Sequence, residues 1–445
     1  MPPRLGSDMA DAFRAPGAGP QQNRNSDLQH GSRATARVLA RGEQAMYRRL
    51  SPLARAVTAA AAASVLSAGL LITTGYDADA GTAPAVMASR SCRPAVTRLP
   101  DLGHGGAAVS FSGSTIVGSV NDAHGQDHPA IWRDGRLTVL RTSVISNGEA
   151  NDINSRGQIV GDADNFTKSW ELHGGSITIL RDVHGSHADF ARRINARGQI
   201  AGAADNLTRA ARWSSAAARP VLLAPQPADK FSFSHGINDA GEVAGDSDAA
   251  DGTPYAAVWD RAGHIRVFAG AFGPGSPAQL FVINDSGQSV GESFAVTGGN
   301  IVGDEATIWS ATGAPRGLGY LPGLNQSTAF GLSGSGTVTG ESSQFDFAHN
   351  RMSHGHGFIW PGHGDLLTLP VPHLTYAKSQ SNFHKVSDNG TVAGTAGPVH
   401  GLMHAFVWTC AFRQAFRPPL THSSRRAPTA LAKWEFAGLS VDYRG

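Results

Sequence analysis

Short runs of alternating apolar and polar residues, separated by glycine-containing turns, recur along residues 96–410. The stretch 153–161 reads INSRGQIVG, and close or looser copies of its Ile-Asn-x-x-Gly element begin at Ile194, Ile237, Ile283, Leu332 and Val386. Alternation with a period of two predicts strands, and Asn-x-x-Gly predicts a tight turn because glycine adopts a left-handed conformation without strain. Each element therefore predicts a β-hairpin. In the first copy Ser114 replaces the expected turn glycine.

Seven of the eight tryptophans recur at intervals of 38 to 51 residues, and they are Trp132, Trp170, Trp213, Trp259, Trp309, Trp360 and Trp408. Each ends an apolar strand, and a turn and another short apolar strand usually follow. Self-similarity at this period indicates a repeat architecture, and four short antiparallel strands per unit are typical of propeller blades. We therefore predict an all-β fold, a seven-bladed β-propeller of four-stranded blades. The strands are named a to d in each blade, and the tryptophans are expected to pack between blades.

The two ends of the repeat region predict how the ring closes. The seventh unit has no fourth strand after Trp408, whereas an extra apolar strand at 96–99 precedes the first unit. We predict that this N-terminal strand completes the last blade. Cys92 and Cys410, the only cysteines, would then share one c–d turn. We predict that they form a disulfide worth roughly 5 kcal/mol under the chain-entropy model, the alternative being two free thiols.

The terminal segments have different compositions from the repeats. Residues 1–55 are basic and predicted to be disordered, and Met46 is an alternative start of the protein. Residues 56–88 combine an alanine-rich apolar run with small-residue cleavage sites, which predicts a signal peptide rather than a membrane anchor. The mature protein is thus expected to be secreted, with no membrane span. Residues 411–445 are predicted to be a disordered basic tail, outside a propeller domain of 92–410.

Charge is segregated along the chain although the formal net charge is only +2. Residues 1–55 contain nine Arg and four acidic residues, and residues 411–445 contain six basic and two acidic residues, so the repeat region is net negative. A nucleic-acid-binding protein carries its positive charge on the folded surface. We therefore expect no nucleic-acid partner, and we expect a monomer.

Several of these motifs also resemble a known family. His404-Ala-Phe-Val-Trp408, the stretch 318–329 and the Ile-Asn-x-x-Gly elements resemble the HAF repeat of bacterial extracellular proteins. The resemblance covers residues 96 to about 410. It implies a repetitive extracellular protein and no particular activity, because that family has no established common chemistry. Only the seventh unit has the literal His-Ala-Phe, whereas the sixth has His-Gly-Phe from His356.

Motifs for chemistry are sparse. The sequence has no Gly-x-Ser-x-Gly elbow, no phosphate-binding P-loop and no His-Glu-x-x-His pair. The candidate for a cofactor is Ca²⁺, because Asp246, Asp248 and Asp251 alternate in a stretch that ends in Asp-Gly, and calcium prefers several oxygen ligands from a tight turn. A solvated acidic loop is the alternative. We expect no other cofactor.

The variable connections indicate where a partner would bind. From strand b to the Trp of strand c there are nine residues in the second unit and 20 in the sixth. Variable loops on a rigid scaffold commonly carry recognition. We therefore predict a secreted binding or scaffolding module that recognises an extracellular glycan, a cell-wall polymer or a protein, without catalysis. The b–c and d–a connections share one face of a propeller, where we expect 292–304, 341–355, 101–106 and 182–187 to gather.

An enzyme is the alternative function. A secreted polysaccharide hydrolase or lyase would need carboxylates that converge at the central channel. Asp101, Asp182 and Asp304 are the candidate acids in the connections on the b–c and d–a face. The sequence leaves both functions open, because a propeller site is assembled from residues of distant blades.

Overall fold

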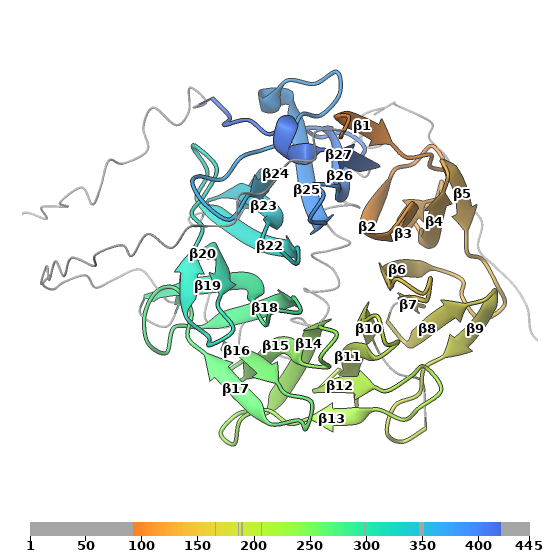
Figure 1. Cartoon of the computed structure of the whole chain (residues 1–445), viewed down its shortest axis with the longest axis vertical. Coiled ribbons are helices and arrows are strands. Elements are labelled where there is room, and N and C mark those ends of the chain that lie inside the picture. The colour runs from red at the N-terminus through yellow and green to blue at the C-terminus, as the bar shows by residue number, and fades with distance from the viewer. Residues whose placement is uncertain are drawn as a thin grey trace, which may run out of the picture.

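The repeats fold into seven antiparallel sheets, which the computed structural model arranges as a ring (Figure 1). The structure describes residues 92–419 except 165, 186, 188–189, 206, 298–299 and 347–350. Helix within this part is limited to two three-residue 3-10 turns, η2 (Tyr376–Lys378) and η3 (Ala411–Arg413). The predicted seven-bladed β-propeller is therefore confirmed.

Each blade contributes strands in the same order from the centre outward. Strand a is β2 (Gly106–Ser112), β6 (Gly148–Ile153), β10 (Phe190–Ile194), β14 (Phe231–Ile237), β18 (Ala278–Ile283), β22 (Gln326–Leu332) and β25 (Ser379–Val386). Strand b is β3 (Thr115–Asn121), β7 (Ile159–Ala163), β11 (Ile200–Ala204), β15 (Val243–Asp248), β19 (Ser289–Thr297), β23 (Val338–Asp346) and β26 (Val392–Pro398). Strand c is β4 (Asp127–Arg133), β8 (Lys168–His173), β12 (Arg209–Trp213), β16 (Pro254–Trp259), β20 (Asn300–Trp309), β24 (Arg351–Trp360) and β27 (His404–Thr409).

Strand d is shorter and lies at the rim. It is β5 (Arg136–Val139), β9 (Ser176–Ile179), β13 (Val221–Leu223), β17 (Ile265–Phe268), β21 (Pro315–Gly317) and, in the seventh blade, β1 (Ala95–Arg98). The sixth blade is a three-stranded sheet, in which Leu367 bridges Ile359 in place of a regular fourth strand.

The hydrophobic core lies between neighbouring blades. One cluster joins Leu223 of the third blade to Ile237 and Trp259 of the fourth. The Trp259 indole N–H donates to the carbonyl of Ala224, in the connection from the third blade, at 2.7 Å. Four other tryptophans make the equivalent bond to the preceding d–a connection, at 2.7 to 2.8 Å, and they are Trp132, Trp213, Trp309 and Trp408. These five tryptophans therefore fasten their blades to the preceding ones, as predicted, whereas Trp360 donates to the carbonyl of Gly364 within its own blade at 3.0 Å.

Trp170 departs from this arrangement. It pairs with Gly161, whereas in the third blade the glycine of strand b pairs with Ala211 and Trp213 lies two residues further on. Its indole N–H donates to the carbonyl of Asp162 within the same blade. A Cβ on Gly161 would lie 2.4 Å from the indole ring, so this glycine makes room for the displaced side chain.

The a–b turns form a ladder around the ring. Each turn glycine from the second to the seventh blade has a left-handed φ of 75° to 89°, as the motif predicts. The Asn195 side-chain amide donates to the carbonyl of Asn238 in the next blade, and Asn238 donates in the same way to Asn284. In the first blade Gly113 supplies the left-handed residue at φ 58°, so the missing glycine expected at Ser114 is explained by a turn one residue shorter.

The ring closes as predicted. β1 pairs with β27 in antiparallel register, and a disulfide joins Cys92 to Cys410 with the Cα atoms 5.9 Å apart. The described chain continues beyond this bond, where Ala411 is buried and Phe416 bridges Thr368. Residues 411–416, which we expected in the tail, therefore belong to the folded body.

The remaining predictions for the termini concern residues that the structure does not describe. The leader 1–55 with Met46, the signal peptide 56–88 and the tail from 420 all lie outside the described residues. Across the described part of the chain, no helix has the length and apolar character needed to cross a membrane.

Candidate functional site

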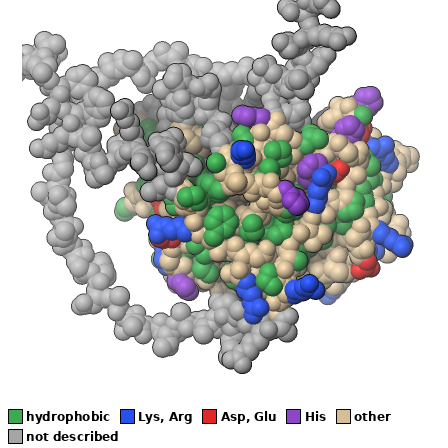
Figure 2. Space-filling view, turned by 90° about the horizontal axis from the view of Figure 1, so that it is seen from above, with side chains coloured by type: hydrophobic (Ala, Val, Ile, Leu, Met, Phe, Trp, Pro, Cys, Tyr) green, Lys and Arg blue, Asp and Glu red, His purple; other side chains and the backbone are tan. Residues whose placement is uncertain are grey.

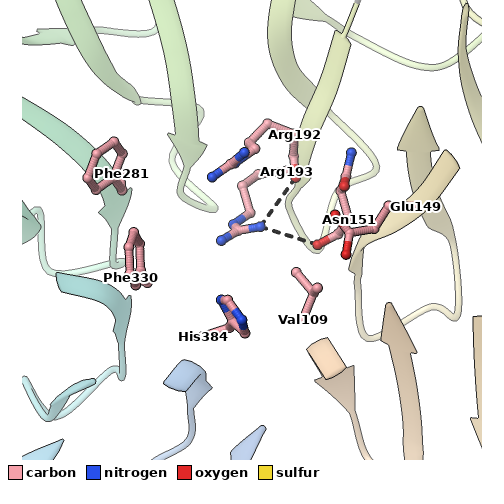
Figure 3. Close-up of a pocket in the computed structure, with 8 residues that line it drawn as sticks. All are labelled: Val109, Glu149, Asn151, Arg192, Arg193, Phe281, Phe330 and His384. Carbon is pink, nitrogen blue, oxygen red and sulfur yellow. Dashed lines mark hydrogen bonds between the residues drawn. The ribbon is translucent and has the colours of Figure 1, made fainter. Parts of the chain in front are cut away.

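A β-bulge interrupts strand a at the same place in all seven blades. In each case one residue is left unpaired between two ladder pairs, and the seven bulged residues are Val109, Asn151, Arg192, His235, Phe281, Phe330 and His384. A bulge twists a strand and re-aims its side chains. Strands a line the centre of the ring (Figure 1). The bulges of all blades except the fourth direct chemically different side chains into the central channel (Figure 3).

The channel widens toward the a–b turns. A cavity of ≈ 400 Å³ is lined by the turn residues Asn195, Asn238 and Asn284 together with the ends of strands a. A second cavity of ≈ 20 Å³ lies among the bulged residues, and both cavities are lined by Arg193, Phe330 and His384. We call the two cavities the funnel, the larger one its mouth and the smaller one its floor.

Two consecutive arginines of β10, Arg192 and Arg193, line the floor. Successive side chains of a regular strand point to opposite faces, so this arrangement depends on the bulge. Figure 3 shows both guanidinium groups directed into the channel. Nη1 of Arg193 donates to the carbonyl of Asn151 at 3.2 Å. Within the described part of the chain, the Arg192 guanidinium makes no hydrogen bond and lies 5.5 Å from the ring centroid of Phe190.

A third cation, Lys385, stands beside the arginines at the mouth and is partly neutralised. Its Nζ donates to Oγ of Ser110 at 2.8 Å and to Oδ1 of Asp152 at 3.2 Å. The backbone N–H of Ile194 donates to the other oxygen of Asp152 at 3.0 Å. Burial opposes ionisation of Asp152, but the charges of Lys385 and Arg193 and these hydrogen bonds hold its pKa below the ordinary value. Asp152 is therefore ionised, and its two oxygens are occupied by the bonds to Lys385 and to the N–H of Ile194.

The rings of Phe281, Phe330 and His384 form the opposite wall (Figure 3), and His235 extends this arc of rings without lining either cavity. The rings of His235 and Phe281 lie 5.4 Å apart between centroids, Phe281 and Phe330 lie 5.9 Å apart, and Phe330 and His384 lie 6.1 Å apart. Burial lowers the pKa of His384 to about 3, and the positive charges of Arg193 and Arg192 add to this effect. His384 is therefore neutral near pH 7, and the arc carries no charge from it.

The carboxyl groups near Arg192 are held in the protonated form more strongly than is usual. Burial raises the pKa of Glu149, which lines the floor, to about 8, and the neighbouring acids Asp162 and Asp127 contribute to the rise. Burial likewise raises the pKa of Asp162 to about 7, and the Asn151 side chain donates a hydrogen bond to it at 2.8 Å. Near neutral pH these acids compensate the charge of Arg192 only in part.

The acids proposed for an enzyme lie elsewhere. Asp101, in the connection before β2, accepts the backbone N–H of Gly103 at 2.7 Å and lies 2.6 Å from Nδ1 of His404. Asp182, in the connection before β10, accepts the N–H of His184 at 2.8 Å. Asp304 lies in β20, where burial raises its pKa to about 7. They belong to three separate parts of the ring, and none of them lines the funnel.

The calcium candidates are divided between a strand and a turn. Asp246 and Asp248 lie in β15, where Oδ1 of Asp246 is 3.0 Å from Nε2 of His235. Burial raises the pKa of Asp248 to about 10, with Asp246 adding to the rise. Asp251 is exposed and accepts the N–H of Thr253. In the described residues no group of three His, Cys, Asp or Glu side chains is placed to hold a metal.

The face formed by the b–c and d–a connections differs from what the sequence suggested. The stretches 292–304 and 341–355 are mostly long hairpins, β19–β20 and β23–β24, rather than open loops. Val296 and Ile301, a cross-strand pair in the first hairpin, are exposed by 44% and 51%. On the edge of the ring seen in Figure 2, hydrophobic side chains are interspersed with polar, basic and histidine side chains.

The fold and the channel together define a seven-bladed propeller, locked by a disulfide, with a funnel open at its a–b turn face. No family model and no curated protein matches the sequence. Among solved structures, the chain is similar to virginiamycin B lyase from Staphylococcus aureus, with 11% identity, a TM-score of 0.45 and coverage of 72% of this chain and 99% of that one.

A second similar structure is the β-propeller domain of the Trilobed protease from Pyrococcus furiosus. It has 10% identity and a TM-score of 0.41, and the match covers 68% of this chain and 92% of that one. That domain is described as having an open velcro topology, whereas β1 and β27 close the present ring. These likenesses concern the fold alone.

Proposed function

We propose that this protein is an extracellular binding module of the HAF-repeat type and that its ligand enters the funnel from the a–b turn face. The observation that carries the proposal is the ≈ 400 Å³ mouth at the ring centre, which falls in the size range of small-ligand sites. The Cys92–Cys410 disulfide supports an extracellular setting, because disulfides persist in oxidising compartments.

The repeat itself supports this location. The Ile-Asn-x-x-Gly elements fix the backbone around the funnel almost identically in successive blades. The bulged residue just before each element, in contrast, differs in size, charge and polarity from blade to blade, as Asn151, Arg192 and Phe281 illustrate. Side chains that differ from blade to blade around one cavity, on a backbone that the repeat holds constant there, are what a binding site requires.

Binding fits the funnel better than glycoside hydrolysis does. That chemistry commonly uses two carboxyl groups that flank the reacting bond. Four acids line the funnel, and they are Glu149, Asp152, Asp239 and Asp285. Asp239 and Asp285 each accept a backbone N–H of the preceding blade's turn at 2.7 Å, so they hold the rim together. Asp152 is already bonded to Lys385, Ser110 and the N–H of Ile194, so it is not available as a base or nucleophile without breaking this network.

The test is a screen of acidic and neutral glycans and of peptides, with three versions of the protein. Val282 and Ser155 line the mouth, so Val282→Trp and Ser155→Trp should each obstruct it from a different blade. The third version shortens the β23–β24 hairpin at its tip on the opposite face. Thermal melting establishes that each variant is folded.

We expect ligands that the native protein and the hairpin variant retain and that both tryptophan variants lose. Two results would overturn the proposal. One is binding that survives both tryptophan substitutions but disappears when the hairpin is shortened, which would place the site on the b–c and d–a face. The other is that none of the compounds in the screen binds.

A further inference from the structure

We propose that the funnel recognises a carboxylate carried on a ligand with a flat apolar face. The inference rests on the proposed function and adds the chemical class of the ligand. It follows from the division of the funnel into a cationic side, with Arg192 and Arg193 of the third blade, and an aromatic side, with Phe281 and Phe330 of the fifth and sixth blades (Figure 3). Lys385 of the seventh blade adds a third cation at the mouth. A ligand that satisfies both sides must combine an anion with an apolar surface.

The cationic side has hydrogen-bond donors to spare. A guanidinium offers five N–H donors in a planar fork that matches a carboxylate. Arg193 uses Nη1 for the carbonyls of Asn151 and Arg192, and Arg192 makes no hydrogen bond among the described residues. Both side chains are only partly buried, so a ligand can reach them from the channel.

Charge at this level of the channel is unbalanced. Arg192, Arg193 and Lys385 contribute three positive charges. Asp152 pairs with Lys385, Glu149 and Asp162 compensate Arg192 only in part, and Asp239 and Asp285 bond to backbone N–H groups at the rim. Charges that are partly removed from water interact more strongly than they do at the surface. A carboxylate placed between the two guanidinium groups would compensate their positive charge. A neutral ligand would displace water from them without supplying an opposite charge.

The aromatic side offers a surface for the rest of the ligand. Phe281 and Phe330 are neighbours at 5.9 Å between centroids, and both line the floor. A flat apolar face, either an aromatic ring or the C–H face of a sugar, packs against such rings. The floor, at ≈ 20 Å³, has room for about one water molecule. The carboxylate would therefore reach the floor while its carrier occupies the ≈ 400 Å³ mouth, where it can pack against Phe330, which lines both cavities.

Calorimetric titration with matched small probes tests the inference. Benzoate and glucuronate supply a carboxylate on an aromatic ring and on a sugar, benzamide and glucose are their neutral counterparts, and sulfate is a bare anion. Arg192→Gln removes one charge of the funnel. Arg197→Gln is the matched control, because Arg197 is exposed on the same a–b turn face and does not line the funnel.

We expect at least one of the two carboxylates to bind and Arg192→Gln to weaken it by about tenfold or more, the typical effect of losing a hydrogen bond to a charged group. Arg197→Gln should leave the affinity unchanged. Preference for benzoate would identify an aromatic acid, and preference for glucuronate an acidic sugar.

Three results would overturn the inference. Neutral counterparts that bind as tightly as the carboxylates would exclude the anion requirement, and sulfate that binds as tightly would exclude the apolar face. An equal loss in the Arg192 and Arg197 variants would show a general charge effect. In the first two cases, loss of binding in Val282→Trp would leave the proposed function intact, so the two failures are distinguishable.

Discussion

The disulfide between Cys92 and Cys410 gives a prediction whose size follows from the structure. It closes a loop of 318 residues, for which the chain-entropy model gives about 6 kcal/mol of stabilisation at 25 °C. Measured values are commonly smaller, about 2 to 4 kcal/mol. We therefore expect the double variant Cys92→Ser/Cys410→Ser to lose about 3 kcal/mol of unfolding free energy.

The loss should be smaller than the model value for a structural reason. β1 has four residues, and of these only Val96 is partly buried. The strand is held by its ladder with β27, and each hydrogen bond contributes about 1 kcal/mol. Without the disulfide, β1 can detach while the other six blades stay folded. The seventh blade then opens at its outer strand before the whole ring unfolds.

Urea unfolding and amide hydrogen exchange measure the two parts of this prediction. For a domain of this size the urea slope is roughly 3 kcal/mol per molar, so the midpoint should fall by about 1 M. Exchange should accelerate at β27 amides that face β1, and amides of β11 should be unaffected. The double variant should not respond to a reducing agent, whereas the native protein should shift to the same midpoint. An unchanged midpoint with unchanged β27 protection would refute the assigned role of the bond.

Three further outcomes follow. Asn238→Ala should cost about 2 to 4 kcal/mol in urea unfolding, because it removes side-chain bonds to Glu242 and Asn284, and Ala240→Ser at an exposed site of the same turn should cost almost nothing. Because burial raises the pKa of Glu149 from 4.5 to about 8, the unfolded chain loses this proton first. Stability should therefore fall as the pH rises from about 4.5 to 8, and Glu149→Gln should flatten this fall in melting curves. Trp213→Phe should lower the melting temperature through loss of its bond to the Arg181 carbonyl, and wild-type stability in that variant would contradict the assigned role of the indole N–H.

Most of the fold was predictable from the sequence because the same motifs recur in each repeat unit. A period of 38 to 51 residues, marked by tryptophan and by a glycine turn, fixes the number of blades and the order of strands. The lack of a fourth strand after Trp408 and the extra strand before the first unit predicted the closure, and the two cysteines followed from it. The errors were local. The first hairpin is one residue shorter. Trp170 lies two residues before the position of the other tryptophans, opposite Gly161, where the absence of a Cβ leaves room for the indole.

The funnel was not predictable in the same way. A β-bulge cannot be recognised from the alternation of apolar and polar residues, because in the sequence it is only one additional residue before the repeated Ile. The signal that could have found it is the pair of residues in front of each Ile-Asn element, such as Arg192-Arg193 or Asn151-Asp152, which breaks the apolar pattern with a different chemistry in each unit. Loop length favoured the b–c and d–a face as the binding site, because insertions can be recognised in a sequence whereas the direction of a side chain cannot.

The constancy of the a–b turns has a structural cause. The turn asparagines donate to the carbonyl of the next blade, so a change in one turn disturbs two blades. These bonds start from the turns of the second to fifth blades, which form part of the rim of the mouth. Bulged residues such as Arg192 and Phe281 project inside this rim and can be exchanged without touching the ladder. The rim and the lining of the funnel are therefore separate parts of the same repeat, and the bulged residues of six blades line the funnel with five kinds of side chain.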